Sequence, residues 1–211
     1  MAKKLKKGLL ITFDGPEGSG KSTHSSRIND ELLWRGYDVV YTREPGGTLL
    51  GKKIRDILLE KDEISLGKAA ELFLFEADRA QHVEEIIAPA LAAGKIVICD
   101  RFSAATFAYQ GYASGTDIKI ILDMDYLATT GIVPDLTILL DVDVKIGLER
   151  ARGQSSPDRM EKKPPEFHEK VREGYHAIAE EHPGRIKLIE ACQDINRTYE
   201  LVKKEVYDFL Q

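Results

Sequence analysis

The chain has 211 residues, of which 43% are hydrophobic and 31% charged, as is usual for one soluble domain with a sizeable core. The net charge of -5 argues against a general nucleic-acid-binding protein, since these are usually basic. We find no run of about 18 apolar residues and expect no membrane span. Cys99 and Cys192 form no disulfide framework. Nothing suggests export, because the lysine-rich residues 1–7 are interpreted as a solvated basic tail, and we expect a cytoplasmic protein.

The most informative stretch is 9–23, LLITFDGPEGSGKST. Residues 9–13 are apolar or β-branched and predict a short buried strand. The following turn has the spacing Gly15-x-x-x-x-Gly20-Lys21-Ser22, the phosphate-loop motif in a strand–turn–helix context. The alternative, a glycine-rich turn capped by Ser22, explains fewer of these features. The stretch therefore predicts binding of a nucleoside triphosphate.

Each residue type in this loop has a chemical reason to be there. Glycines adopt positive φ without a steric penalty and turn backbone N–H groups inward. These groups and the next helix N-terminus form an anion site. Lys21 can reach the β- and γ-phosphates, and the Ser22 hydroxyl can ligate Mg²⁺. We expect the nucleoside triphosphate to contact Gly15, Pro16, Glu17, Gly18, Ser19, Gly20, Lys21, Ser22 and Thr23.

Strands and helices alternate along the rest of the chain, which predicts one α/β domain with a mostly parallel sheet covered on both faces. Further strands are expected at 38–42, 96–99, 136–142 and 186–189. Helices are expected at 21–35, 51–60, 117–130, from 144, around 167–178 and around 195–206, and 66–93 is helix-rich. Pro89 should kink that stretch or begin a new helix. Residues 103–115 predict a helix that breaks into a glycine-containing loop.

Two strands end in polar residues that suit a ligand crevice. The stretch 43–48, Arg-Glu-Pro-Gly-Gly-Thr, follows the second strand, and loops at the carboxyl ends of parallel strands line such crevices. Asp100 ends the third strand, where phosphate-loop proteins often carry the metal-side acid, although a helix-capping role is the alternative. Cys99, before it, is interpreted as a small core residue.

Arg79 and the insert after residue 152 leave alternatives open. Phe75 and Arg79 extend an apolar helical stripe, so Arg79 either faces a cleft or pairs with a carboxylate such as Glu76. Residues 153–157 form a polar insert near Arg150, Arg152 and Arg159. Taken alone, this insert favours a solvated surface loop over a mobile lid.

Together these residues resemble the thymidylate kinase family, which phosphorylates dTMP to dTDP with ATP. The resemblance spans residue 9 to the last helix. The phosphate loop is shared with many NTPases and says little about the substrate. The more specific motifs occur in the family's order and spacing: TREPGGT at 42–48, Phe75 with Arg79, DRF at 100–102, AYQG at 108–111, and Asp158-Arg159.

The resemblance implies a P-loop NTPase nucleotide-kinase fold with five parallel strands in the order 2-3-1-4-5, in one domain spanning 1–211. It also implies a lid at about 150–161, Mg²⁺ as cofactor, ATP and dTMP as substrates, and a homodimer. By resemblance, Phe75 stacks on thymine, Arg79 hydrogen-bonds its carbonyl, and Arg43 and Arg101 grip the dTMP phosphate. The substrate-binding residues implied are Glu17, Arg43, Pro45, Phe75, Arg79, Arg101, Thr106, Tyr109 and Gln110.

The phosphate loop carries no arginine, so the chain is similar to the bacterial type, in which lid arginines serve catalysis. This implication favours the lid interpretation, with Arg150 near ATP. The implied catalytic residues are Lys21, Asp100, Arg101, Arg152 and Arg159, and the implied metal ligands are Ser22 and Asp100. Two positions depart from the family pattern: Phe102 replaces a common Tyr or His, and Ala105 a common serine.

The expected reaction is in-line attack by a dTMP phosphate oxygen on the γ-phosphorus of ATP, with no strong general base because the acceptor is already anionic. The alternatives are a kinase for another nucleoside monophosphate or a deoxynucleoside, and a regulatory P-loop ATPase. The absence of an Asn-Lys-x-Asp motif argues against a GTPase.

Overall fold

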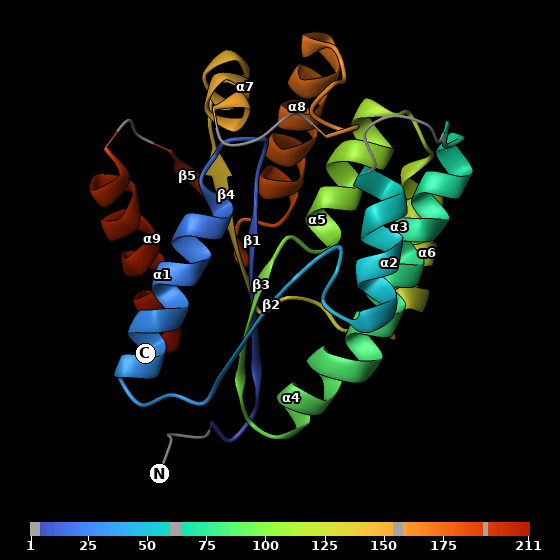
Figure 1. Cartoon of the computed structure of the whole chain (residues 1–211). Helices are drawn as coiled ribbons and strands as arrows, with labels where there is room; N and C mark the ends of the chain where they lie inside the picture. The colour runs from blue at the N-terminus through green and yellow to red at the C-terminus, as the bar shows by residue number, and fades with distance from the viewer. Residues whose placement is uncertain (1–4, 60–64, 154–157, 192–193) are drawn as a thin grey trace.

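A computed structural model describes residues 5–59, 65–153, 158–191 and 194–211. Its five strands form a parallel sheet in the order β2-β3-β1-β4-β5 (Figure 1). The strands are β1 (Leu9–Asp14), β2 (Val39–Arg43), β3 (Ile96–Asp100), β4 (Leu136–Asp141) and β5 (Ile186–Glu190). The predicted strand positions and strand order are confirmed.

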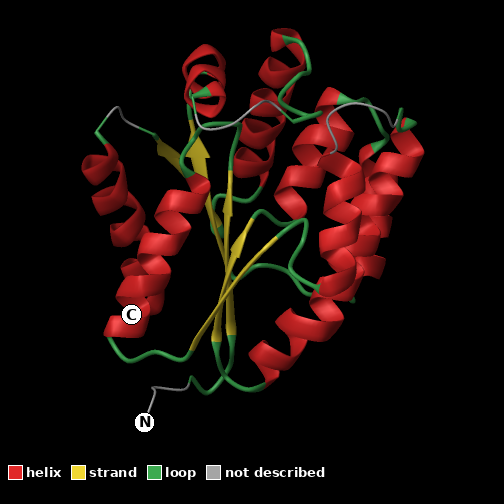
Figure 2. Cartoon of the chain, in the orientation of Figure 1, coloured by secondary structure: helices red, strands yellow, loops and turns green. Residues whose placement is uncertain are grey.

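Helices cover both faces of the sheet, as Figure 2 shows. One face carries α1 (Lys21–Trp34) and α9 (Ile195–Leu210). The other carries α4 (Ala88–Ala92), α5 (Ser103–Thr106), α8 (Pro165–Glu181) and the π-helical segments η1 (Val83–Ile87) and η2 (Phe107–Ala113). Outside these lie α2 (Leu49–Leu59), α3 (Lys68–His82) and α6 (Ile118–Thr129), while α7 (Val144–Arg152) follows β4.

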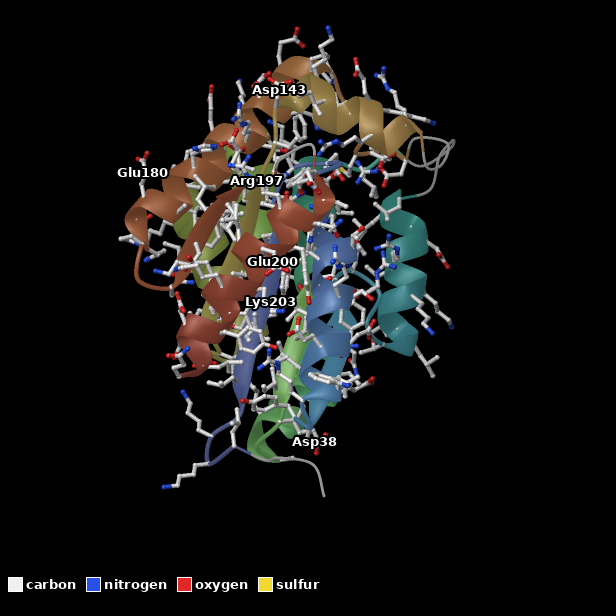
Figure 3. The ribbon with its side chains drawn as sticks, turned by 90° about the vertical axis from the view of Figure 1, so that its left-hand side faces the viewer. Asp38, Asp143, Glu180, Arg197, Glu200 and Lys203 are labelled. Atoms are coloured by element: carbon white, nitrogen blue, oxygen red, sulfur yellow. The ribbon has the colours of Figure 1, made fainter. Side chains whose placement is uncertain are left out.

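Apolar residues from the strands separate into cores on the two faces. Ile11 and Phe13 of β1 pack with Ile28 of α1 and Val202 of α9, and all four are at most 1% exposed. Complete burial of one such side chain contributes roughly 1.5–3 kcal/mol, so this interface fixes α9 on the sheet. The outer side of α9 is charged, as the labelled Arg197, Glu200 and Lys203 illustrate (Figure 3).

The prediction for residues 103–115 is confirmed. The helix runs as α5 and then as π-helix to Ala113, and a turn that contains Gly115 follows it. A Cβ at Gly111 would lie 2.7 Å from Cδ1 of Ile118, so this glycine allows η2 to pack closely against α6 and does not end the helix. π-helical turns are frequent at functional sites, and this one contains Tyr109 and Gln110.

Pro89 was expected either to kink a helix or to begin a new one, and it lies at the beginning of α4. It lies in the first turn of α4, directly after the π-helical η1. The N–H of Ala88 bonds to the carbonyl of Val83, an i→i−5 bond of the π-helical type, and Pro89 directly after it has no N–H to donate into the regular i→i−4 ladder.

Several sequence expectations concern other parts of the molecule. Cys99 is a fully buried core residue, as predicted. Residues 1–4 of the basic tail, 154–157 of the insert and Cys192 lie outside the described residues. In the part of the chain that the structure describes, no helix has the length and apolarity needed to cross a membrane.

The parallel register gathers the polar strand ends at one edge of the sheet. Asp100 of β3 is opposite Phe13 of β1 on one side and opposite Arg43 of β2 on the other. The phosphate loop leaves β1 directly after this position, and the loop beginning at Glu44 leaves β2. Three segments distant in sequence therefore meet at the carboxyl edge, where open α/β sheets bind ligands.

Candidate nucleotide-binding site

A cleft of about 810 Å³ lies at this edge. It is lined by the phosphate loop, the loop after β2, the inner side of α3, the start of α5 and part of α7. The predicted site residues that line it are Glu17, Gly18, Ser19, Gly20, Lys21, Ser22, Thr23, Arg43, Pro45, Phe75, Arg79, Asp100, Arg101, Thr106, Tyr109, Gln110 and Arg150. Gly15 and Pro16 are buried at the base of the loop.

The phosphate loop needs its glycines. Gly18 has φ of 66°, and a Cβ there would lie 2.0 Å from the carbonyl oxygen of Gly147 in α7. Gly15 has φ of 142°, and its Cβ would meet the carbonyl of Leu140 at 2.2 Å. α1 begins directly after the loop, at Lys21, and no side chain caps the helix at Gly20. The first-turn N–H groups are therefore free of intrahelical partners and suit an anion.

Lys21 is folded onto the loop. Its Nζ donates to the carbonyl of Pro16 at 2.7 Å and to Oγ of Ser19 at 3.4 Å. Burial and the nearby charge of Arg101 lower the pKa of Lys21 to about 8. An anion in the loop would stabilise its charged form.

The two predicted metal ligands are adjacent. The hydroxyl of Ser22 donates to Oδ2 of Asp100 at 2.5 Å. Hydroxyl and carboxylate oxygens are hard donors of the kind that Mg²⁺ prefers, so this pair fits a magnesium ion bound beside the phosphates. The alternative role of Asp100 was to cap the following helix. Its Oδ2 instead accepts a hydrogen bond from Ser22, so that oxygen does not cap α5.

Glu17 organises the acceptor side of the cleft. Its Oε1 accepts hydrogen bonds from Arg101 and from the hydroxyl of Tyr109, both at 2.7 Å. Burial by itself would raise the pKa of Glu17, but the charges of Arg101 and Lys21 outweigh it and lower the pKa to about 2. Glu17 is therefore ionised and holds the Arg101 guanidinium in place.

The backbone of Arg101 is strained. Its φ is 70°, in the left-handed region that non-glycine residues rarely adopt. The N–H of Arg101 donates to the carbonyl of Phe13 at 2.9 Å, which helps to keep this conformation. Such strain costs about 1–3 kcal/mol and is often found at functional positions.

Both interpretations of Arg79 apply at once. Its guanidinium lines the cleft, as the first interpretation predicted. It also pairs with Glu76 at 2.7 Å, as the second interpretation predicted. Glu44 and Asp125 add ion pairs at 3.0 and 3.1 Å. Phe75 lines the same part of the cleft one turn earlier on α3. The aromatic ring of Phe75 and the N–H donors of Arg79 thus line the same part of the cleft.

The three lid arginines occupy different environments. Arg150 lines the cleft, whereas Arg152 is exposed and lies outside the lining. Arg159 donates to Glu71 at 2.6 Å and to the carbonyl of Leu58 at 2.9 Å, so its guanidinium is engaged by α2 and α3. In this conformation, Arg150 is the one of the three that faces the cleft.

Sequence reasoning missed a further arginine of the cleft. Arg55 of α2 lines the cleft and donates to the carbonyl of Pro45 at 2.9 Å. Burial, together with the charges of Arg43 and Arg101, lowers the pKa of Arg55. No spacing signal distinguishes it from the surface cations of α2, so only the packing of that helix reveals it.

Asp14, the last residue of β1, was also missed. Its side chain is fully buried, and neither carboxylate oxygen has a hydrogen-bond partner among the described residues. Burial raises the pKa of Asp14 to about 7, against the opposing effect of Arg101 and Lys21. The available signal was the acid at the end of an otherwise apolar strand, directly before Gly15.

Comparison with known proteins agrees with this geometry. A family model described as "Thymidylate kinase" matches residues 13–204. The thymidylate kinase of Desulfovibrio desulfuricans is 50% identical over 192 residues, covering 88% of each chain. That of Halothermothrix orenii is 47% identical over 204 residues, covering 95% of each. The crystal structure of thymidylate kinase from Ehrlichia chaffeensis has a TM-score of 0.78 at 37% identity, covering 95% of this chain and 99% of the other.

The raised pKa of Asp14 predicts a pH-dependent effect of Asp14→Asn. The unfolded carboxyl loses its proton near pH 4, whereas the folded one keeps it up to about pH 7, so wild-type stability falls over that window. The stability of Asp14→Asn relative to wild type should therefore rise by about 3 kcal/mol from pH 5 to pH 8. Urea denaturation at both pH values measures this, and a pH-independent difference would contradict it.

Proposed function

The chain belongs to the thymidylate kinase family, and on that premise we propose how its residues transfer the γ-phosphoryl group of ATP to dTMP to form dTDP. One observation carries the proposal: two regions suited to anions line the same cleft. The phosphate loop forms one region, and Arg43, Arg55 and Arg101 line the other. Main-chain N–H groups of the loop would bind the phosphates of one nucleotide, and the three arginines would bind the phosphate of the other, so that the two nucleotides meet end to end.

The phosphate loop is the proposed ATP site. Main-chain N–H groups of the loop and of the first turn of α1 bind the phosphates, and Lys21 leaves the Pro16 carbonyl to contact the β- and γ-phosphates. Ser22 and Asp100 would hold Mg²⁺, which offsets the charge of the phosphates when bound. Arg150, at the end of α7, is the lid arginine best placed to contact ATP.

The region between α3 and η2 is the proposed dTMP site. Phe75 stacks on the thymine ring, and the remaining free N–H of Arg79 hydrogen-bonds a ring carbonyl. Gln110 lies near the base, where Glu71 holds its side-chain amide at 2.8 Å. The Glu17–Tyr109 pair faces the sugar, and Pro45 and Thr106 shape the pocket.

Catalysis rests on positioning and charge. The acceptor phosphate is already anionic, so it attacks in line without a general base. Arg101 contacts both the acceptor and the transferring group, and its fork geometry suits phosphate oxygens. For Arg159 to add its charge, it has to leave Glu71 and the Leu58 carbonyl, and Arg152 has to turn into the cleft. Both therefore act only after the lid moves.

We also propose that the chain forms a homodimer through the outer side of α2, α3 and α6. α3 packs against both α2 and α6, and these helices expose several large apolar side chains. Exposure reaches 79% for Leu127, 71% for Tyr126 and 59% for Phe73. Apolar side chains gathered in this way mark interaction surfaces, and a second copy of the chain presents the same surface.

An acceptor assay tests the function directly. With ATP and Mg²⁺, dTMP should be phosphorylated faster than dUMP, dCMP or AMP, as measured by coupled ADP release. The thymine methyl contributes only about 1–3 kcal/mol, so dUMP should be a slow substrate. Preference for another nucleotide would identify a different kinase, and equal ATP hydrolysis without any acceptor would indicate an ATPase.

Arg101→Ala should collapse turnover. Removal of an arginine that stabilises the transferring phosphoryl group lowers the rate by about 10³ or more. Arg101→Lys keeps the charge without the fork and should restore only part of the rate. Arg35→Ala, at the exposed end of α1, is the matched control and should leave kcat unchanged. A wild-type rate in Arg101→Ala would remove this residue from the mechanism.

Leu127→Glu should convert the dimer to monomer, because it places a charge in the apolar interface. Light scattering after size-exclusion chromatography measures this. Leu33→Glu, at a half-exposed site on α1 on the opposite face of the sheet, is the control and should remain dimeric. A dimeric Leu127→Glu protein or a monomeric wild type at micromolar concentration would refute the proposed interface.

A further inference from the structure

A buried chain of hydrogen bonds leads from β2 to the base pocket. Oγ1 of Thr42 lies 2.6 Å from Nε2 of His82, and Nδ1 of His82 lies 2.8 Å from Oε1 of Glu44. Oε2 of Glu44 accepts from Nε of Arg79 at 3.0 Å. His82 is fully buried and Glu44 is 5% exposed. His82 has no role in the proposed function, yet it is one hydrogen-bonded residue away from the arginine that contacts the base.

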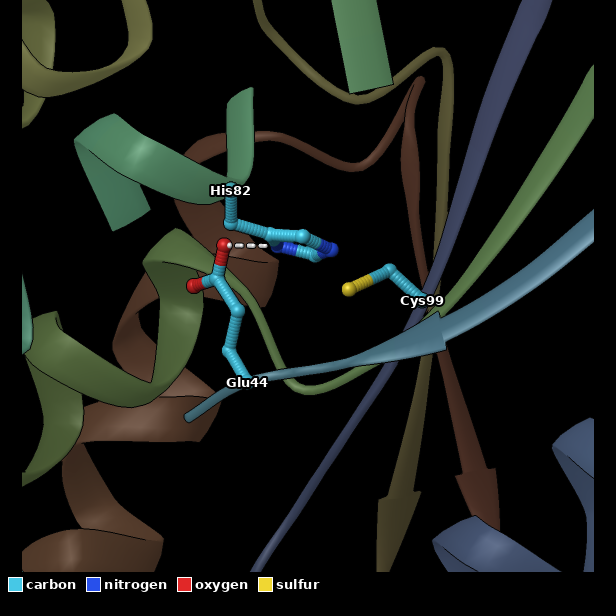
Figure 4. A group of neighbouring side chains, drawn as sticks. All are labelled: Glu44, His82 and Cys99. Carbon is cyan, nitrogen blue, oxygen red and sulfur yellow. Dashed lines mark hydrogen bonds and ion pairs between the residues drawn. The ribbon is translucent and has the colours of Figure 1, made fainter. Parts of the chain in front are cut away.

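The same group does not make a convincing metal site. Glu44, His82 and Cys99 offer ligand atoms within 4.8 Å of one another (Figure 4). Both nitrogens of His82 and both oxygens of Glu44 are already engaged, however, and Sγ of Cys99 donates to the carbonyl of Arg101 at 3.0 Å. The guanidinium of Arg79 supplies the positive charge that balances Glu44. The structure therefore favours a hydrogen-bond network.

The donors and acceptors in this network assign one tautomer. Arg79 can only donate, so Glu44 accepts from it with Oε2. Oε1 of Glu44 is an acceptor too and requires a proton on Nδ1 of His82. Nε2 of His82 then accepts from the hydroxyl of Thr42. The tautomer with the proton on Nδ1 thus satisfies every member, and each carboxylate oxygen of Glu44 has its own donor.

The network leaves one donor of Arg79 for a ligand. A guanidinium has five N–H groups. One bonds to Glu44, two to Glu76 and Asp125, and one to Thr106 at 3.0 Å. Among the described residues, the second N–H of Nη2 has no acceptor, and Arg79 lines the cleft. Glu44 is one of the four groups that set the direction of this N–H, and in the described part of the chain it alone holds the Nε edge; Glu44 is held in turn by His82.

His82 also supports the loop that carries Glu44. A Cβ at Gly47 would lie 2.5 Å from the His82 ring, so the ring packs directly beneath this loop. Oδ1 of Asp78, one helical turn before His82, accepts from the N–H of Gly46 at 3.0 Å. The position of Glu44 over the base pocket is therefore set by α3.

We propose that His82 is a positioning residue for base recognition: through Glu44 it orients the free N–H of Arg79 toward a carbonyl of the acceptor base. This inference rests on the proposed function of Arg79. A guanidinium only donates, so it pairs with a ring carbonyl of thymine and opposes the amino group that cytosine carries in place of one carbonyl. His82 thereby contributes to the discrimination between dTMP and dCMP.

Two variants of His82 separate hydrogen bonding from packing. His82→Leu fills the space without a donor, whereas the side-chain amide of His82→Asn can replace the Nδ1 donor. His82→Leu should raise KM for dTMP and lower the dTMP:dCMP ratio of kcat/KM, each on the order of tenfold. KM for ATP should stay within about twofold, and His82→Asn should recover most of the loss.

Several results would overturn the inference. A folded His82→Leu with dTMP KM and discrimination within about twofold of wild type would do so. Equal losses in His82→Leu and His82→Asn, or a parallel loss in KM for ATP, would indicate a purely structural role. If His82→Leu does not fold, Thr42→Val against Thr42→Ser decides: only the valine variant should shift discrimination. A wild type inactive on dTMP would refute the proposed function itself.

Discussion

Carboxylates hold key arginines in and beside the cleft, and this constraint organises the site. Glu17 holds Arg101 and Glu44 holds Arg79 within the cleft, whereas Glu71 holds Arg159 outside its lining. Without these partners, several guanidinium groups would converge on a partly dry cleft and repel one another. Removing one partner of a buried pair typically costs about 3–5 kcal/mol, so the acids fix the directions of the arginines before any nucleotide binds. An overall charge of -5 is therefore compatible with a site for anions.

This arrangement also explains how the cleft is prepared for phosphate. Burial and Arg101 lower the pKa of Lys21, and burial raises that of Asp14. Both pKa shifts favour the neutral form of the group, because burial removes the water that would stabilise its charge. Incoming phosphates add the negative charge that favours the protonated lysine. Binding energy and the charged state of Lys21 are thus coupled, which is what a site built for phosphoryl transfer requires.

The sheet and its helices place these ion pairs at one edge of the molecule's β-sheet. Parallel strands place Asp100, Arg43 and the phosphate loop at one edge. The π-helical η2 then presents Tyr109 toward Glu17 and Gln110 toward Glu71, from consecutive positions of one segment. Gly111 permits this segment to pack against α6.

The sequence by itself determined the phosphate loop, the alternation of strands and helices and, through family resemblance, the strand order and many of the residues that line the cleft. These features depend on local spacing, such as Gly15 to Ser22 or Phe75 to Arg79, which dictates backbone geometry and the side of a helix. Only the tertiary structure decided that Arg79 is both paired and facing the cleft, that Arg159 is engaged by Glu71, and that the Asp14 carboxylate is fully buried with no side-chain partner among the described residues. Those outcomes depend on side chains from distant segments, and local spacing carries no information about which of them meet.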